Sequence, residues 1–292
     1  MRFLTLVFIL GLPCTSLAQT ALRLDYGVQE VRSVPVAGTA ISYLERGNGD
    51  AVVLFHPAVD FRYWQWTIEA VSPSYRVLAL PFASAMPGGG PFDPSALIEF
   101  LGAVAGEPVH LVAHSMGATQ AMALASARPD LVRSLVLVEP GGSPDPSVLG
   151  ELVAAVGNCS LSNPSEALLA SCQSMNYVAG DGYFENASPQ FQEIALAAGR
   201  AIDESLQSAG SLDQALVQFV PPPDCGSLGR LQMPILFVRG ESSPLGMRGG
   251  LDAFERCLPE HETRIIAAAS HFVHLDATDA FNQAVLDFLG RN

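Results

Sequence analysis

One serine stands where a strand-like run passes directly into a helix-like run. Residues 109–113 suit a buried strand, Ser115 follows, and residues 118–127 are rich in alanine, leucine and methionine. A serine at such a turn is held in a strained backbone conformation that lifts its hydroxyl above the sheet edge. Small residues must flank it, and Ala113 and Gly117 do so, although glycine is more usual where Ala113 stands. The pattern predicts a nucleophile; the alternative is a serine in an ordinary strand-to-helix turn.

A serine nucleophile needs a base beside it. The hydroxyl is weak at neutral pH, and the base in turn needs a carboxylate that fixes its tautomer. His271 follows the strand-like run 263–266, where a loop would return the imidazole to Ser115. His274 comes three residues later, at the start of the final helix. We therefore predict His271 as the general base and His274 as a structural residue.

The elements that must position these residues alternate along most of the chain. Apolar runs typical of buried strands alternate with helical patterns, and a strand pair at 31–36 and 39–45 precedes them. The buried runs are 51–55, 75–80, 109–113, 135–138, 234–240 and 263–266. Strands that alternate with helices form a mostly parallel sheet with helices on both faces. The sequence therefore predicts an α/β fold.

This alternation stops between residues 142 and 231. That stretch shows no clear strand, and helix-like segments alternate in it with Pro, Asn, Ser and Gly. We interpret it as a helical cap or lid inserted into a core made of residues 19–141 and 232–292. Such an insertion would roof the site and set substrate access.

Several short motifs follow one another in a meaningful order. His56-Pro57 ends the first central strand, His114-Ser115-Met116-Gly117 forms the turn described above, and Ser270–Asp276 precedes the last helix. In these features nearly the whole chain after residue 18 resembles the α/β-hydrolase superfamily, and in particular exported bacterial serine esterases and lipases. The resemblance implies the α/β-hydrolase fold, with its mostly parallel central sheet, flanking helices and inserted helical cap. It also implies the order nucleophile, acid, histidine along the chain.

The resemblance leaves two candidates for the acid. Many family members carry it three residues after a glycine that ends the penultimate strand. Here that glycine is Gly240, and the position holds Ser243, which cannot act as an acid. Glu139 ends the strand that follows the nucleophile unit, is fixed by Pro140, and occupies a position that some members use. We predict Glu139 as the acid, with Glu241 as the alternative.

An acyl-transfer site also needs two donors for the developing oxyanion. The backbone N–H of Met116, directly after the nucleophile, is one candidate. The second is expected from the loop after His56; since Pro57 has no N–H, we predict Ala58. Family members usually have glycine where Pro57 stands. We expect His56 itself to be structural.

The acidic composition limits the partners. The chain has 29 Asp and Glu against 15 Lys and Arg, a net charge of -14. This charge argues against nucleic acid and anionic membrane surfaces as partners. The six histidines are dispersed and no H-E-x-x-H motif occurs, so no metal and no cofactor are expected.

Residues 1–18 have the pattern of a signal peptide. A positively charged start and a short apolar core precede Ser16-Leu17-Ala18, a small-x-small cleavage site. The apolar core is too short for a stable membrane span. An uncleaved anchor is one alternative, and a lipid on Cys14 is another, although Pro13 stands where such sites have a small residue. We expect an exported protein, periplasmic or extracellular, without stable insertion in the membrane.

Export also changes how the cysteines are interpreted. Beyond the signal peptide four remain, an even number in an oxidising compartment. Of the three pairings we favour Cys159 with Cys172 and Cys225 with Cys257. Zinc ligation is an alternative that lacks a C-x-x-C pair, and free buried thiols are another.

Together these residues predict a serine hydrolase of small-molecule carboxylic esters, with a Ser-His-Glu triad and an acyl-enzyme intermediate. The same triad could instead hydrolyse lactone, amide or C–C bonds. A non-catalytic binding protein on this fold is a further alternative, but such proteins usually lose a triad member. Dehalogenases and epoxide hydrolases of this fold need a carboxylate where Ser115 stands.

Overall fold

The structure is a computed structural model that describes residues 31–36, 38–56, 61–81, 94–142, 159–162, 166–187, 191–193, 195–196 and 223–292. The predicted signal peptide, residues 1–18, lies outside the described residues. So do Ala58 and much of the predicted cap. No described helix is long and apolar enough to cross a membrane.

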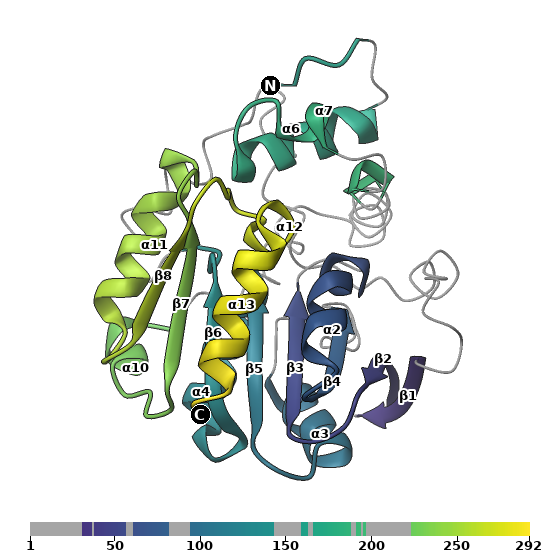
Figure 1. Cartoon of the computed structure of the whole chain (residues 1–292), viewed down its shortest axis with the longest axis vertical. Coiled ribbons are helices and arrows are strands. Elements are labelled where there is room, and N and C mark those ends of the chain that lie inside the picture. The colour runs from purple at the N-terminus through teal and green to yellow at the C-terminus, as the bar shows by residue number, and fades with distance from the viewer. Residues whose placement is uncertain are drawn as a thin grey trace.

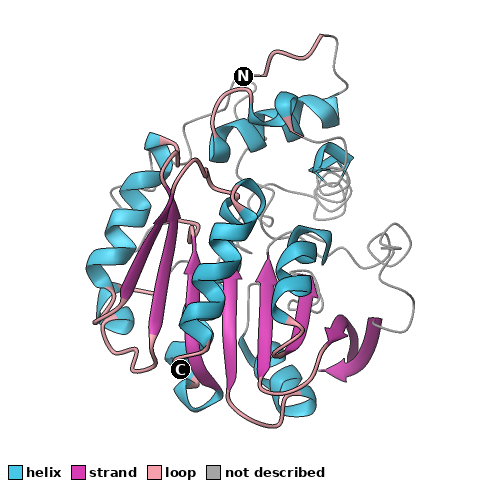
Figure 2. Cartoon of the chain, viewed as in Figure 1, coloured by secondary structure: helices cyan, strands magenta, loops and turns pink. Residues whose placement is uncertain are grey.

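A single eight-stranded sheet forms the centre of the molecule, in the order β1-β2-β4-β3-β5-β6-β7-β8 (Figures 1 and 2). The pairs β1/β2 and β2/β4 are antiparallel, and all the other neighbours are parallel. The strands are β1 (Val31–Val36), β2 (Thr39–Arg46), β3 (Ala51–His56), β4 (Arg76–Pro81), β5 (Val109–His114), β6 (Val132–Val138), β7 (Ile235–Gly240) and β8 (Glu262–Ile266). The predicted mostly parallel α/β sheet is confirmed.

Helices connect the strands and cover the sheet. They are η1 (Phe61–Trp64), α2 (Gln65–Val71), α3 (Pro94–Val104), α4 (Met116–Ala127), η3 (Pro129–Leu131), α6 (Glu166–Ala179), α7 (Tyr183–Asn186), α10 (Cys225–Leu228), α11 (Leu245–Cys257), α12 (Val273–Asp276) and α13 (Thr278–Leu289). A short additional helix, α12, precedes the last helix and contains His274.

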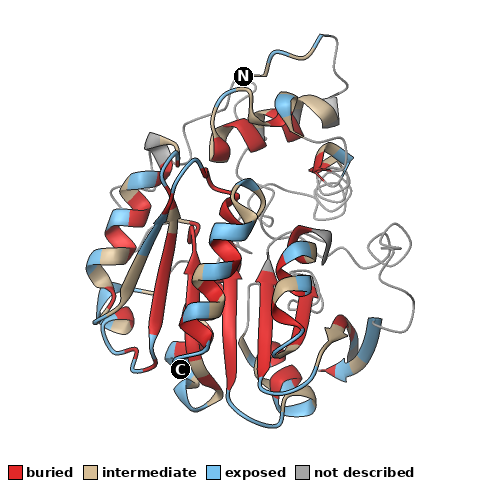
Figure 3. Ribbon diagram, in the orientation of Figure 1, coloured by how far each residue is buried: buried red, intermediate tan, exposed pale blue. Residues whose placement is uncertain are grey.

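Alternate residues of each central strand point to opposite faces of the sheet. In β5, Leu111 and Ala113 share a hydrophobic cluster with α3 and α4, whereas Val112 shares one with α2 and α13. All six residues of β5 are buried (Figure 3). A parallel strand that is covered on both faces must be apolar almost throughout, which explains the strand-like runs in the sequence. The sheet is thus a rigid base whose carboxyl edge carries the candidate site.

The described part of the predicted cap lies beyond this carboxyl edge (Figure 1). Its helices α6 and α7 have their own hydrophobic cluster, which Tyr63 and Phe272 join from the core side. Residues 223–231, which the sequence placed in the cap, pack with the core instead: Leu228 and Leu231 belong to the cluster of α3, α4 and α11.

Two disulfides join the cysteines in the pairs that the sequence favours. Cys159 bonds to Cys172, with 5.8 Å between the Cα atoms, and Cys225 bonds to Cys257, with 4.8 Å. The first ties the segment 159–162 to α6, and the second ties α10 to the end of α11. Closing loops of this length stabilises a fold by about 3 kcal/mol in the chain-entropy account.

Candidate active site

The serine of the strand-to-helix turn has the strained backbone that the sequence predicts. Ser115 lies between β5 and α4 with a φ of 56°, in a region that L-residues rarely adopt. Its N–H donates to the carbonyl of Val138, which fixes the turn against the neighbouring strand. A Cβ on Gly117 would lie 2.8 Å from the carbonyl oxygen of Phe55, so strand and helix approach too closely for any other residue there.

The predicted base reaches this serine from the loop after β8. The Nε2 atom of His271 lies 3.1 Å from the Oγ of Ser115, and both residues are buried. His114, next to the serine in sequence, lies 2.8 Å by its Nε2 from the carbonyl oxygen of His271. Its ring N–H donates to that carbonyl and thereby holds the histidine loop on the turn that carries Ser115.

The predicted acid completes the chain of contacts. Glu139 follows β6, is fully buried, and has an Oε2 atom 3.4 Å from the Nδ1 of His271. Its φ is 45°, so two of the three predicted triad residues have a strained backbone, as functional residues often do. The alternative acid, Glu241, is exposed and accepts a hydrogen bond from the backbone of Ala268. The structure therefore brings Ser115, His271 and Glu139 together and places Glu241 elsewhere.

The other oxygen of the Glu139 carboxylate is held by the end of β7. The Oε1 atom accepts hydrogen bonds from the N–H of Gly240 at 2.7 Å and from the Oγ of Ser243 at 2.5 Å. Sequence reasoning missed this role of Ser243. The signal was present, because a small hydroxyl residue at the usual acid position leaves room for a carboxylate from the neighbouring strand.

Asp276 also holds the loop that carries His271. The Oδ2 atom of Asp276 accepts hydrogen bonds from the N–H and the Oγ of Ser270, at 2.8 and 2.6 Å. Its Oδ1 atom accepts one from the hydroxyl of Tyr183 in α7, at 2.7 Å. Burial, followed by the negative charge of Asp276, raises the pKa of Tyr183, so the phenol remains a neutral donor. Asp276 in α12 and Tyr183 in the cap helix α7 thus fix the histidine loop together.

His274 packs beneath this loop, as a structural residue should. Its ring lies 4.5 Å from the ring of Trp64 and 4.9 Å from that of His114, centre to centre. Burial, and next the neighbouring His271, lower the pKa of His274 to about 3. The ring is therefore neutral at physiological pH and adds no charge beside the predicted base, His271.

One of the two predicted oxyanion donors lies within the described residues. Met116 is the first residue of α4, and the first N–H groups of a helix have no acceptor within the helix. A Cβ on Gly141 would lie 3.1 Å from the Met116 nitrogen, so the glycine leaves space beside this donor. Thr119 fixes Gly141 through a hydrogen bond from its Oγ1 to the glycine carbonyl, at 2.7 Å. The second predicted donor, Ala58, lies outside the described residues.

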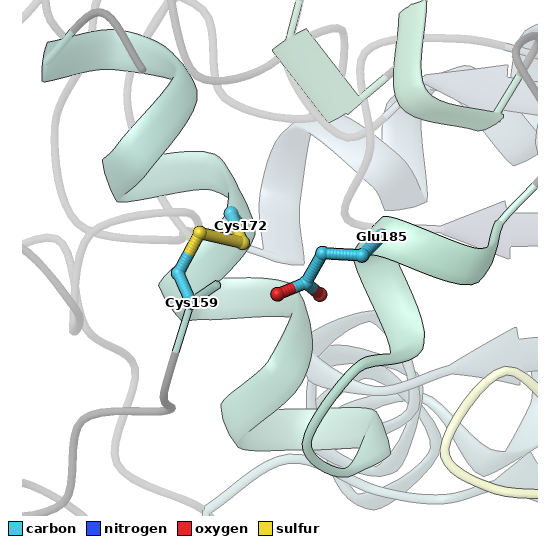
Figure 4. A group of neighbouring side chains, drawn as sticks. All are labelled: Cys159, Cys172 and Glu185. Carbon is cyan, nitrogen blue, oxygen red and sulfur yellow. A yellow bond between two sulfur atoms is a disulfide. The ribbon is translucent and has the colours of Figure 1, made fainter. Parts of the chain in front are cut away.

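Cys159, Cys172 and Glu185 form a second cluster, in the cap (Figure 4). Their potential ligand atoms lie within 4.8 Å of one another, but the disulfide removes the thiolates that zinc requires. Burial opposes ionisation of Glu185, yet hydrogen bonds from Ser160 and Asn176 lower its pKa to about 2. The carboxylate therefore acts as a structural acceptor beside the disulfide.

Known proteins resemble this chain in sequence and fold. A sequence profile of the "Alpha/beta hydrolase family" matches residues 52–284. The dihydrolipoyllysine-residue acetyltransferase component of the acetoin cleaving system from Cupriavidus necator is 32% identical over 123 residues. That match covers 38% of this chain and 32% of the relative, so it spans about a third of the relative's length.

Two solved structures share the fold over nearly their whole length. Carboxylesterase CesB from Bacillus subtilis has 17% identity and a TM-score of 0.68, over 90% of this chain and 92% of its own. A meta-cleavage product hydrolase from Pseudomonas fluorescens IP01 has 19% identity and a TM-score of 0.68, over 90% and 99%. The fold that the resemblance implied is confirmed, and the family profile matches most of the chain. The protein therefore belongs to the alpha/beta hydrolase family.

Proposed function

We propose that the protein hydrolyses carboxylic esters with Ser115 as nucleophile, His271 as general base and Glu139 as acid. The observation that carries this proposal is the continuous line of contacts from Ser115 Oγ to His271 Nε2, at 3.1 Å, and from His271 Nδ1 to Glu139 Oε2, at 3.4 Å. A hydroxyl, an imidazole and a carboxylate in this order can activate the serine for acyl transfer.

The reaction proceeds in two halves. The Oγ of Ser115 attacks the ester carbonyl while its proton passes to the Nε2 of His271, and the tetrahedral oxyanion accepts a hydrogen bond from the N–H of Met116. The intermediate collapses, the C–O bond to the alcohol breaks, and His271 returns the proton to the leaving alkoxide. Water then attacks the acyl-serine by the same route and releases the acid. Throughout, Glu139 stabilises the positive charge that forms on the imidazole.

The position of the Met116 N–H strengthens its interaction with the negative charge of the oxyanion. It lies at the N-terminus of α4, where the helix dipole favours negative charge, and a preorganised donor of this kind contributes about 3–4 kcal/mol to the transition state. We propose Ala58 as the second donor, from the loop after β3.

The test is hydrolysis of p-nitrophenyl esters from acetyl to long acyl chains, by the wild-type protein and by Ser115→Ala. We expect turnover by the wild-type protein that falls by about a thousandfold or more in the variant. Thermal unfolding of both proteins controls for folding. Wild-type protein that hydrolyses no ester, and whose Ser115 is not labelled by an organophosphonate, would overturn the proposal and favour another substrate bond or a binding role.

We also propose that the protein is exported, with residues 1–18 removed. Two disulfides agree with an oxidising compartment. The N-terminal sequence and the unreduced mass of the protein isolated from its native cells test this. An intact N-terminus together with free thiols would refute it.

A further inference from the structure

A cavity of about 640 Å³ lies between the described part of the cap and the core. Tyr63 and Trp66 line it from the core side, Tyr183 and Phe191 from the cap side, and Asp276 from α12. The lining residues include members of α2, α7 and α12, which Figure 1 labels. Neither the nucleophile nor the base is among the described lining residues. The cavity is in the size range of small-molecule sites.

Four aromatic side chains line its wall. The ring centre of Phe191 lies 5.9 Å from that of Tyr63 and 5.5 Å from that of Tyr183, both in edge-to-face contact. Trp66 differs from the rest of the wall because 47% of its surface is exposed, whereas Trp64, two residues earlier, is buried. A half-exposed tryptophan on the wall of a cavity keeps part of its surface available to a ligand.

The charge of the wall is negative. Asp181 and Asp276 line the cavity, and none of the described lining residues carries a positive charge. The hydrogen bonds to Asp276 come from neutral groups, namely the hydroxyl of Tyr183 and the N–H and hydroxyl of Ser270. The net charge of the whole chain, -14, adds to the negative potential. An anionic ligand would be repelled here, whereas a cation would be attracted.

We propose that this cavity binds an organic cation, a substituted ammonium group with apolar arms. Aromatic faces attract such a group through the ring quadrupole, and the carboxylates supply the opposite charge. A bare metal ion fits less well, because the cavity carboxylates belong to none of the potential metal-binding groups of three or more side chains among the described residues. The proposal does not depend on ester hydrolysis.

Phe272 is close to both the cavity wall and the candidate active site. Its ring centre lies 5.3 Å from that of His271 and 5.4 Å from that of Tyr183, which lines the cavity. The cation could therefore be a free ligand or the charged part of a substrate. The same chemistry would recognise both.

Choline and 3,3-dimethylbutan-1-ol are the probes, since they have the same shape and differ in charge. Calorimetric titration into the Ser115→Ala variant measures binding without turnover. We expect choline to bind with a Kd about tenfold lower than that of the neutral alcohol. Equal binding of the two, or no binding of choline at millimolar concentration, would overturn the proposal.

Variants locate the binding in this cavity. Trp66→Ala is expected to weaken choline binding by about tenfold and Trp66→Phe by less, because phenylalanine keeps a ring. Asp276→Asn and Asp181→Asn should weaken choline but not the alcohol. Asp287→Asn is the matched control, since this exposed carboxylate lies near the far end of α13. A choline affinity that is unchanged in both Trp66→Ala and Asp181→Asn would place the cation elsewhere and refute the site.

A second arm identifies the source of the cation, once binding to Ser115→Ala is measured. Competitive inhibition of p-nitrophenyl acetate hydrolysis by choline would support a cationic group on the substrate. Binding without competition would support a separate ligand. If no ester is hydrolysed, the calorimetry still decides whether the cation binds, so the two proposals can fail independently.

Discussion

The Oγ of Ser243 lies 2.5 Å from Oε1 of Glu139, although 104 residues separate the two in sequence. One strand end thus supplies the carboxylate, and the neighbouring strand end supplies the hydroxyl that holds it. The N–H of Gly240 binds the same oxygen, which leaves Oε2 directed at His271. The hydroxyl stands at the position that many family members give to the acid itself.

The first prediction separates the two candidate acids. Glu139→Gln should lower kcat/KM for ester hydrolysis by about 10³–10⁴-fold, because an amide cannot stabilise the imidazolium. Glu241→Gln should stay within about twofold of wild type, since that carboxylate is exposed and contacts the backbone of Ala268. Steady-state kinetics at neutral pH measure both. The opposite result, a severe loss only in Glu241→Gln, would show that the assignment of the acid is wrong.

The second prediction concerns the positioning of Glu139. Ser243→Ala removes one hydrogen bond to a charged group, an interaction of about 1.5–3 kcal/mol. We expect kcat to fall about tenfold with little change in KM, because the carboxylate loses its fixed orientation. Ser243→Thr keeps the hydroxyl and should recover most of the activity.

The control for Ser243 is its neighbour. Ser242 is exposed, and its backbone N–H donates to the carbonyl of Ala269, so Ser242→Ala should retain the wild-type kcat. A merely structural role for Ser243 would change the midpoint of thermal unfolding without the selective loss of kcat, and that result would contradict the prediction.

Much of this architecture can be predicted from the sequence, for a physical reason. Strands buried on both faces must be apolar, so runs such as 109–113 reveal the sheet. A nucleophile turn requires small residues at fixed offsets, so Ser115 and Gly117 indicate the proposed nucleophile. The proposed base can be found because parallel strands bring their carboxyl ends to one edge of the sheet.

The remaining features depend on contacts between distant segments. Ser243 at the usual acid position is an indirect signal of its contact with Glu139, but no local pattern shows that His114 donates to the carbonyl of His271. The same holds for Leu228 and Leu231, which stand in the predicted helical insertion and pack in the core cluster.

The third prediction concerns a glycine at the edge of the site. A Cβ on Gly240 would collide with the carbonyl oxygens of Ala269 and Ser270, and backbone cannot move aside as a flexible side chain can. Gly240→Ala should therefore destabilise the fold by about 1–3 kcal/mol, as overpacking does, and displace the histidine loop. Urea unfolding measures the free energy change.

Gly102 in α3 is the matched control for Gly240. A Cβ there would have no heavy atom within 4 Å, and alanine favours a helix over glycine by about 1 kcal/mol. Gly102→Ala should thus be neutral or stabilising. Equal destabilisation by both substitutions would indicate that the crowding at Gly240 is not the cause.

The fourth prediction concerns stability in acid. Burial, and next the positive charge of Arg133, lower the pKa of His110 to about 4, and burial lowers that of His274 to about 3. In the unfolded chain both histidines titrate near 6.5. Between these values the unfolded state binds more protons than the folded state, so the free energy of unfolding rises with pH. The contribution of these two neutral histidines to the free energy of unfolding is at its full value above about pH 6.5. It falls as the pH drops toward 4.

His110 allows this effect to be isolated, because it is not one of the proposed catalytic residues and contacts Ser134 through its Nδ1, at 2.7 Å. His110→Gln removes one titrating group. Between pH 6.5 and 4 the slope of unfolding free energy against pH should be shallower than in wild type by up to about 1.4 kcal/mol per pH unit. Urea unfolding at several pH values gives both slopes. Parallel curves for the two proteins would mean that His110 titrates alike in the folded and unfolded states, because only a group with different pKa values in the two states couples folding to pH.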